Sequence, residues 1–391
     1  MAGVDFTHQA LRTRLVCRPG AALALADELA HLGCRRPLIL TSKSMRAHSL
    51  YADLLLLLSD VAVAEFDNIP QHSDLEMIGR VTERMNFHEA DCVVAVGGGS
   101  VSDSAKAAAL LFAEGGTLRD LASRFILPAT IVAPDLLRPK VPIISIPTTA
   151  SAAEVTPSFG VRTPEGEKLL FWDPQLASRV ILLDAKLNLS IPAPLMLATG
   201  MNGLAHCLEG LYSTSRSPIS TSLALEGIRR FDHALRAVAR DPESIEYRVE
   251  LLVAAHLSGM VLASARSCLH HAVCHVIGAT CGVPHGLANT VMLPHTVRFN
   301  QSAAPDCLSP IEAVLGESLS ALPPGDDGFL FSWLANLQAE CRLPGSLRDI
   351  GVAREALPDI ARKTMHERGL AFNPRPVNKP DDIEAILDAA W

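Results

Sequence analysis

The stretch Cys92-Val93-Val94-Ala95-Val96-Gly97-Gly98-Gly99-Ser100 decides the fold class of this chain. It predicts a buried strand over residues 92–96, then three glycines, then a helix over residues 101–112. Because glycine lacks a Cβ atom, backbone N–H groups can approach an anion closely, and the helix N-terminus adds a favourable dipole. The pattern therefore indicates a phosphate-binding turn, with the pyrophosphate of a dinucleotide as the candidate ligand. A tight turn without a ligand is the alternative, since the GxGxxG fingerprint is absent.

The sequence around this turn alternates short apolar runs with helical patterns. Strands are predicted at residues 37–40, 61–66, 92–96, 141–146 and 180–183, and helices at residues 45–58, 75–87 and 101–112. This order is typical of a parallel sheet covered by helices on both faces. After Asp184 the strand-like runs disappear, and helices are predicted at residues 195–212, 218–239, 245–265, 269–281 and 312–320. We expect an α/β dinucleotide-binding domain (residues 1–186), an all-helical catalytic domain (residues 187–391), and an active site in the cleft between them.

Composition excludes several classes of function. The 391 residues carry 34 basic and 42 acidic side chains, a net charge of 34 − 42 = −8, so no basic surface for nucleic acid is expected. No signal-peptide pattern and no apolar run of about 18 residues is found, so neither secretion nor a membrane span is expected. The nine cysteines include no CxxC pair, which is consistent with reduced thiols in the cytoplasm.

A second polar loop follows the predicted strand at residues 141–146. The sequence PTTASAAEVT (residues 147–156) places Thr148 and Thr149 in a wall of small, hydrogen-bonding residues, although a simple helix N-cap explains it equally well. Asp103, near the start of the helix after the glycines, either accepts a hydrogen bond from a cofactor amide or only favours the helix N-terminus.

Eight of the 14 histidines fall between residues 206 and 295. His271 and His275 are four apart on a predicted helix and so share one face. His285 is expected in the loop after that helix, and His206 lies on an earlier helix. Three imidazoles from these elements can converge on a metal ion, with Asn202, one turn before His206, as a fourth donor. Satisfied core histidines are the alternative.

Four motifs in this order resemble the iron-containing alcohol dehydrogenase family. They are GGGSVSDSAK (residues 97–106), PTTASAAEVT (147–156), GMNGLAHCLEGLY (200–212) and HHAVCHVIGATCGVPHGLANTVMLPH (270–295), and NPRPVNKPDDIEAIL (373–387) fits as well. The resemblance covers nearly the whole chain. It implies a dinucleotide domain and a helical metal domain, usually in a homodimer, with NADH or NADPH as cofactor and a divalent metal such as Fe or Zn.

The resemblance also assigns roles residue by residue. It implies phosphate binding at Gly97, Gly98 and Gly99, with Ser100 beside them, and further cofactor contacts at Asp103, Thr148, Thr149, Ser42 and Lys168. It implies metal ligation by His206, His271 and His285. The active-site histidine beside the metal falls on His275, and catalysis is expected from His275, His271 and His206.

The chain departs from the family pattern at three places. Asn202 replaces the aspartate ligand, the threonine loop appears one residue shorter, and Ser42 stands where an acidic residue usually follows the first nucleotide-domain strand. The first two resemble the maleylacetate reductase branch, although Ala272 stands where that branch carries lysine. We therefore expect NAD(P)H-dependent hydride transfer to a small carbonyl or enone substrate. The alternatives are a metal-dependent alcohol dehydrogenase, a lyase resembling dehydroquinate synthase, and a non-catalytic binding protein.

Overall fold

The computed structural model describes residues 5–70, 73–126, 130–164, 168–316, 319 and 328–391. Its centre is a six-stranded sheet in the order β1-β10-β7-β4-β2-β3, and every pair of neighbouring strands is parallel. The strands are β1 (Arg14–Cys17), β2 (Pro37–Thr41), β3 (Ala64–Phe66), β4 (Cys92–Gly97), β7 (Ile143–Pro147) and β10 (Val180–Leu183). The α/β class predicted from the sequence is confirmed.

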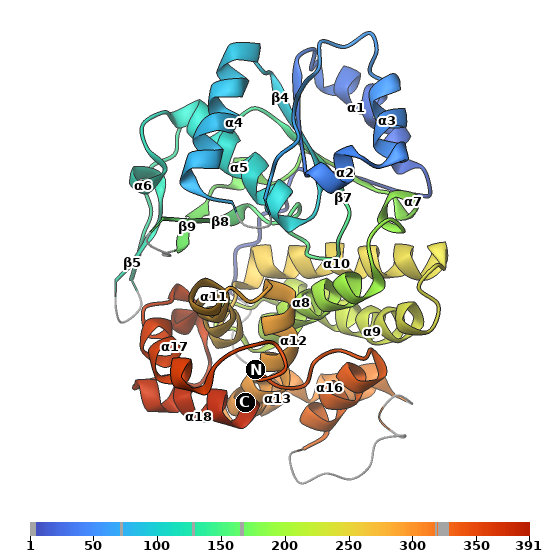
Figure 1. Cartoon of the computed structure of the whole chain (residues 1–391). Helices are drawn as coiled ribbons and strands as arrows, with labels where there is room; N and C mark the ends of the chain where they lie inside the picture. The colour runs from blue at the N-terminus through green and yellow to red at the C-terminus, as the bar shows by residue number, and fades with distance from the viewer. Residues whose placement is uncertain (1–4, 71–72, 127–129, 165–167, 317–318, 320–327) are drawn as a thin grey trace.

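The strand sequences are continuously apolar because helices cover both faces of the sheet. In β4, Val93 and Ala95 pack against α4 (Leu75–His88) and α5 (Gly99–Glu114). Val94 and Val96 point the other way, into the core under α1 (Leu25–Leu32) and α3 (Ser49–Leu56). Figure 1 shows these two helical layers on either side of the sheet.

Some local predictions for this half are wrong. The helix expected at residues 45–58 is divided into α2 (Lys43–Arg46) and α3, because His48 is extended (φ −81°, ψ 138°) and its Nδ1 accepts the N–H of Leu50. The strand expected at residues 61–66 shortens to β3. Edge strand β1 and two antiparallel hairpins, β5 (Arg124–Ile126) with β6 (Thr130–Val132) and β8 (Ser158–Arg162) with β9 (Lys168–Trp172), were not predicted.

Helices make up the chain beyond β10. Below the sheet in Figure 1 lie α8, α9 and α10, with α17 and α18 at the far end. Helix α8 is buried along most of its length, because α9, α10 and α12 pack around it. The helices are α7 (Ala185–Asn188), α8 (Ala193–Tyr212), α9 (Pro218–Arg240), α10 (Ile245–Ala265), α11 (Leu269–Cys281), α12 (His285–Gln301), α13 (Pro305–Leu308), α14 (Pro310–Leu315), α16 (Phe329–Glu340), α17 (Leu357–Thr364) and α18 (Pro380–Ala390).

The four long helices predicted between residues 195 and 281 match α8 to α11 closely, and the one predicted at residues 312–320 coincides with α14 only up to Leu315. Helix α14 ends at Leu315, because Gly316 turns into the left-handed region (φ +48°), and residues 317, 318 and 320 lie outside the described residues. Among the described helices, α10 alone is long and apolar enough to cross a membrane, but half of its apolar stretch is buried against neighbouring helices. The domain boundary at residues 186 and 187 stays a prediction.

The connection from the sheet to the helices is held by one buried arginine. Arg248 on α10 donates hydrogen bonds to the carbonyl oxygens of Asn188 and Ile191 and to Oδ1 of Asn188. Asn188 in turn donates from Nδ2 to the carbonyl of Thr148, at 2.6 Å. The threonine loop is therefore tied to the crossing between the two parts of the chain.

Candidate functional site

One cavity of about 920 Å³ lies between the carboxyl ends of the strands and the helices below them. All but one of the residues predicted for the site line it: Ser42, Gly98, Gly99, Ser100, Asp103, Thr148, Thr149, Lys168, Asn202, His206, His271, His275 and His285. The exception is Gly97, which ends β4 directly behind the lining. Residues from two widely separated parts of the sequence therefore meet in one cleft.

At the first two glycines of the turn there is little space for a side chain. A Cβ atom on Gly97 would lie 2.6 Å from Cγ2 of Val101, and one on Gly98 would lie 3.1 Å from Cγ2 of Thr149. Helix α5 begins at Gly99, so its N-terminus opens on the cavity. Backbone N–H groups and the helix dipole both favour an anion there.

Buried Lys106 joins this helix to the threonine loop. Its Nζ lies 2.8 Å from a carboxylate oxygen of Asp103 and donates to the carbonyl oxygens of Ala153 and Ser158 at 2.9 and 2.7 Å. The N–H of Thr148 also donates to the carbonyl of Gly97. These bonds fix Asp103 and the threonines beside the glycine turn.

Ser42 and Lys168 reach the cavity from two other elements. Ser42 caps α2, where its Oγ accepts the N–H of Met45, and it lies 3.1 Å from the hydroxyl of Ser44. Lys168 begins β9, and burial lowers the pKa of its ammonium group. Among the described residues that line the cavity, the one carboxylate is that of Asp103, which is paired with Lys106.

Four imidazoles gather on the helical side of the cavity. The rings of His206 and His271 stack with centroids 4.7 Å apart, and His285 lies 5.9 Å from His271 and 5.5 Å from His275. His285 is not in a loop as predicted. It is the first residue of α12, because Pro284 in extended conformation forms the N-cap. Burial lowers the pKa of all four imidazoles, so the cluster is neutral at neutral pH.

Both nitrogens of His271 are engaged. Nδ1 lies 2.5 Å from Oε2 of Glu209, and Nε2 lies 3.2 Å from Oδ1 of Asn202, whose Nδ2 donates to the carbonyl of Ser151. With Oδ1 as acceptor, Nε2 carries the ring proton and Nδ1 accepts the proton of a neutral Glu209. Burial raises the pKa of Glu209 to about 7, which agrees with this arrangement.

The histidines as arranged do not fit a metal ion. Three nitrogens bound to one ion at about 2.1 Å lie at most about 4.2 Å apart. Within the described residues, His206, His271 and His285 do not bring three ring nitrogens within 4.8 Å of one another. Asn202 supplies no negative charge, and its amide oxygen faces Nε2 of His271.

His275 differs from His271 in having a nitrogen open to the cavity. Its Nδ1 lies 3.2 Å from Oε2 of Glu367, and no described residue hydrogen bonds to Nε2. His270, which precedes His271, is structural, because its two nitrogens hydrogen bond to Thr296 and Asn289. Nε2 of His275 is therefore placed to exchange a proton with a ligand.

Several lining or supporting residues were missed from the sequence. Glu209 sits three positions after His206 within one quoted motif, a signal that was available. Arg368 begins the short 3-10 helix η4 (Arg368–Phe372) and Glu367 is its N-cap residue, and no periodic pattern marks either of them. Trp172 and Arg266 also line the cavity.

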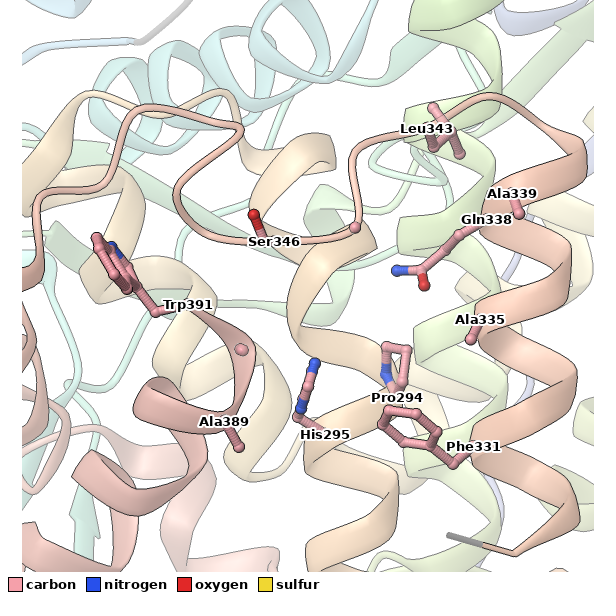
Figure 2. Close-up of a pocket in the computed structure, with 12 residues that line it drawn as sticks. Pro294, His295, Phe331, Ala335, Gln338, Ala339, Leu343, Ser346, Ala389 and Trp391 are labelled. Atoms are coloured by element: carbon pink, nitrogen blue, oxygen red, sulfur yellow. The ribbon is translucent and has the colours of Figure 1, made fainter. Parts of the chain in front are cut away.

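A smaller cavity of about 350 Å³ lies between α12, α16 and α18. Figure 2 shows His295, Phe331 and Trp391 around it. None of the predicted site residues lines this cavity.

Comparison with known proteins decides the family. The model of the iron-containing alcohol dehydrogenase family matches residues 12–185, and the model of its C-terminal region matches residues 196–391. The chain belongs to the iron-containing alcohol dehydrogenase family. It is an oxidoreductase, and this family membership implies a nicotinamide cofactor and an iron or other divalent metal.

Relatives and solved structures of this family match over nearly the full chain. The maleylacetate reductases of Rhizobium sp. (strain MTP-10005) and Burkholderia cepacia are each 31% identical, over 99% of this chain and 97% of theirs. The structure of maleylacetate reductase from Agrobacterium tumefaciens has a TM-score of 0.81 at 29% identity, over 99% of this chain and 98% of that one. The structure of an iron-containing alcohol dehydrogenase from Corynebacterium glutamicum has a TM-score of 0.82 at 28% identity, over 100% of this chain and 97% of that one.

Proposed function

We propose that this chain uses NADH or NADPH to reduce maleylacetate or a closely related oxo-enoate. The observation that carries the proposal is Nε2 of His275, to which no described residue hydrogen bonds, on a side chain that lines the same cavity as the glycine turn. The curated relatives named maleylacetate reductase support the substrate. Maleylacetate is a dicarboxylate in which an alkene is conjugated with a ketone.

A bound nicotinamide supplies a hydride. Reduction of such an enone would place the hydride on the alkene carbon β to the ketone and pass negative charge onto the ketone oxygen. A proton taken up at that oxygen would be lost again when the enol becomes the ketone, as the α carbon gains a proton. Developing charge on the oxygen needs a donor fixed in advance. Glu367 holds the ring of His275 through Nδ1, and burial raises the pKa of Glu367. With the carboxyl group of Glu367 protonated and donating to Nδ1, Nε2 carries the ring proton of the neutral imidazole and can donate it to that oxygen.

The other histidines support this arrangement. His271 is held between Glu209 and Asn202, and His206 stacks on it with its Nδ1 3.4 Å from the hydroxyl of Ser258. We propose His271 and His206 as the walls that orient the substrate, with Gly97, Gly98, Gly99, Ser100, Asp103, Thr148, Thr149, Ser42 and Lys168 contacting the cofactor.

Substrate profiling tests the proposal. The loss of NADPH absorbance is followed with maleylacetate and with small aldehydes, and the product is identified by mass spectrometry. We expect one 3-oxoadipate per NADPH consumed and a kcat/KM for aldehydes at least about 100-fold lower, about 2.7 kcal/mol. A higher kcat/KM for an aldehyde than for maleylacetate would instead support the alternative function, that of a metal-dependent alcohol dehydrogenase.

We also propose a homodimer in the cytoplasm. The nine cysteines are all free thiols in this structure, which suits a reducing compartment. Sedimentation equilibrium of the purified chain tests the dimer, and a monomer at micromolar concentration would contradict it.

A further inference from the structure

The large cavity is lined by an excess of basic side chains. Its charged lining residues, apart from histidine, are the acid Asp103 and the bases Arg162, Lys168, Arg266 and Arg368. Asp103 is already paired with Lys106, and Arg162 donates to the carbonyl of Gly278. Such a wall attracts an anion.

Two of these bases, Arg266 and Arg368, line the same cavity and have no ion pair among the described residues. Arg266 directly follows the last residue of α10, and Arg368 begins η4. Neither guanidinium has an ion pair or a hydrogen-bond partner among the described residues. Glu367, the neighbour of Arg368 in sequence, faces His275 instead. Gly369, next to Arg368, lies against the carbonyl of Cys268, two residues after Arg266, so the two arginines are on neighbouring segments. Burial, and then the charge of Arg266, lowers the pKa of Arg368 to about 10, and Glu367, when ionised, acts in the opposite direction.

The position of Arg266 is restrained by its backbone conformation and by the indole ring of Trp172. Its φ of +65° lies in the left-handed region, which is uncommon for a residue with a side chain and costs free energy unless the surroundings impose it. The guanidinium lies over the indole of Trp172, 5.0 Å from the ring centroid. Nε1 of that indole is buried without a hydrogen-bond partner, so an acceptor is missing here.

Arg368 is fixed by contacts of the residues on either side. Glu367 bonds to His275 at 3.2 Å, and a Cβ atom on Gly369 would lie 2.5 Å from the carbonyl oxygen of Cys268. The η4 segment is therefore pressed against the start of α11, and Arg368 has a set position relative to His275.

We propose that Arg266 and Arg368 form a carboxylate-binding subsite beside His275. This rests on the proposed function, in which the substrate carries two carboxylates next to a conjugated ketone. A carboxylate matches the fork of a guanidinium and replaces the missing counter-ion of both arginines. Binding one substrate carboxylate here sets the ketone oxygen against Nε2 of His275.

The test measures binding of adipate, a saturated six-carbon dicarboxylate, to the enzyme saturated with NADPH, by isothermal titration calorimetry. We expect wild-type enzyme to bind adipate and hexanamide not to bind. Arg266→Gln and Arg368→Gln should each raise the Kd for adipate at least tenfold and change the Kd for NADPH less than twofold. Arg368→Lys should recover part of the loss, because it keeps the charge without the fork.

The matched control is Arg375→Gln, because Arg375 is exposed and stacks on Phe299. Adipate affinity should be unchanged there. The subsite is refuted if wild-type enzyme does not bind adipate or if both Arg266→Gln and Arg368→Gln keep the wild-type affinity for adipate. It is also refuted if these variants lose affinity for NADPH instead.

Turnover separates this inference from the proposed function. Arginine-dependent adipate binding without maleylacetate reduction would keep the subsite and refute the function. Maleylacetate reduction with an unchanged KM in both arginine variants would refute the subsite and keep the function.

Discussion

The two walls of the large cavity differ in the groups that they offer to a ligand. On the sheet side, Gly98, Gly99 and Thr149 expose backbone and small side chains. On the helix side, the wall carries four imidazoles and two guanidinium groups, among them His275 and Arg368. Backbone dipoles can hold a charged cofactor without changing protonation, whereas a proton transfer needs groups whose pKa the surroundings can move. The sheet side is thus suited to binding and the helix side to chemistry, and variants of the two walls should fail differently.

The largest expected effect is on the helix side. His275→Ala should lower kcat about 10²–10⁴-fold, the usual contribution of a general acid, with the Kd for NADPH nearly unchanged. Stopped-flow reduction and fluorescence titration measure the two quantities, and His233→Ala, on the exposed face of α9, is the control. Lost NADPH affinity at unchanged kcat would place His275 at the cofactor.

Glu209 tests the protonation state assigned to the helix side. Glu209→Ala leaves Nδ1 of His271 without a partner and should lower the free energy of unfolding by about 1–3 kcal/mol. Glu209→Gln should be nearly neutral, because its amide can donate to Nδ1 as the neutral carboxyl group does. Denaturant unfolding checks both, and equal losses in the two variants would show that Glu209 is ionised.

Gly97 is the corresponding test on the sheet side. Gly97→Ala should weaken the binding of NADPH by about 1–3 kcal/mol through overpacking, because the added Cβ would meet Val101 and displace the glycine turn. The control is Gly79→Ala in α4, where a Cβ meets nothing within 4 Å. A reduced kcat with unchanged NADPH affinity would contradict the division between the walls.

Metal removal should change little. With Asn202 in place of a carboxylate, the site lacks a charge–charge attraction for a divalent ion. We expect dialysed protein to hold well under one equivalent of Fe or Zn and chelation to leave activity within twofold. One tightly held equivalent, with activity lost on removal and restored on return, would show that Asn202 is a competent ligand.

Cofactor choice should give the smallest effect. Ser42 offers a hydroxyl where an acid would repel a 2′-phosphate, so NADPH should be accepted at least as well as NADH. Steady-state kinetics with both cofactors measure the ratio. A preference for NADH of about 100-fold or more, about 2.7 kcal/mol, would be inconsistent with this reading.

The difference between the walls also explains what the sequence could predict. The strand and glycines at residues 92–99 form a local pattern, and His271 and His275 share a face by helical spacing, so both were found. Glu367 lies 92 positions from the His275 that it contacts, and only tertiary packing brings them together. The division of the helix after β2 depends on the extended backbone of one residue, His48, which no periodicity reveals.

Arg248 has a mechanical consequence. By hydrogen bonding α10 to the carbonyls of Asn188 and Ile191, it restrains the segment that connects β10 to the helices. Thr148 is bonded to the same Asn188, so any torsion of that crossing is transmitted directly to the cofactor side of the cleft. The crossing behaves as a clamped joint rather than a hinge, and it keeps the threonine loop at a fixed place relative to α10.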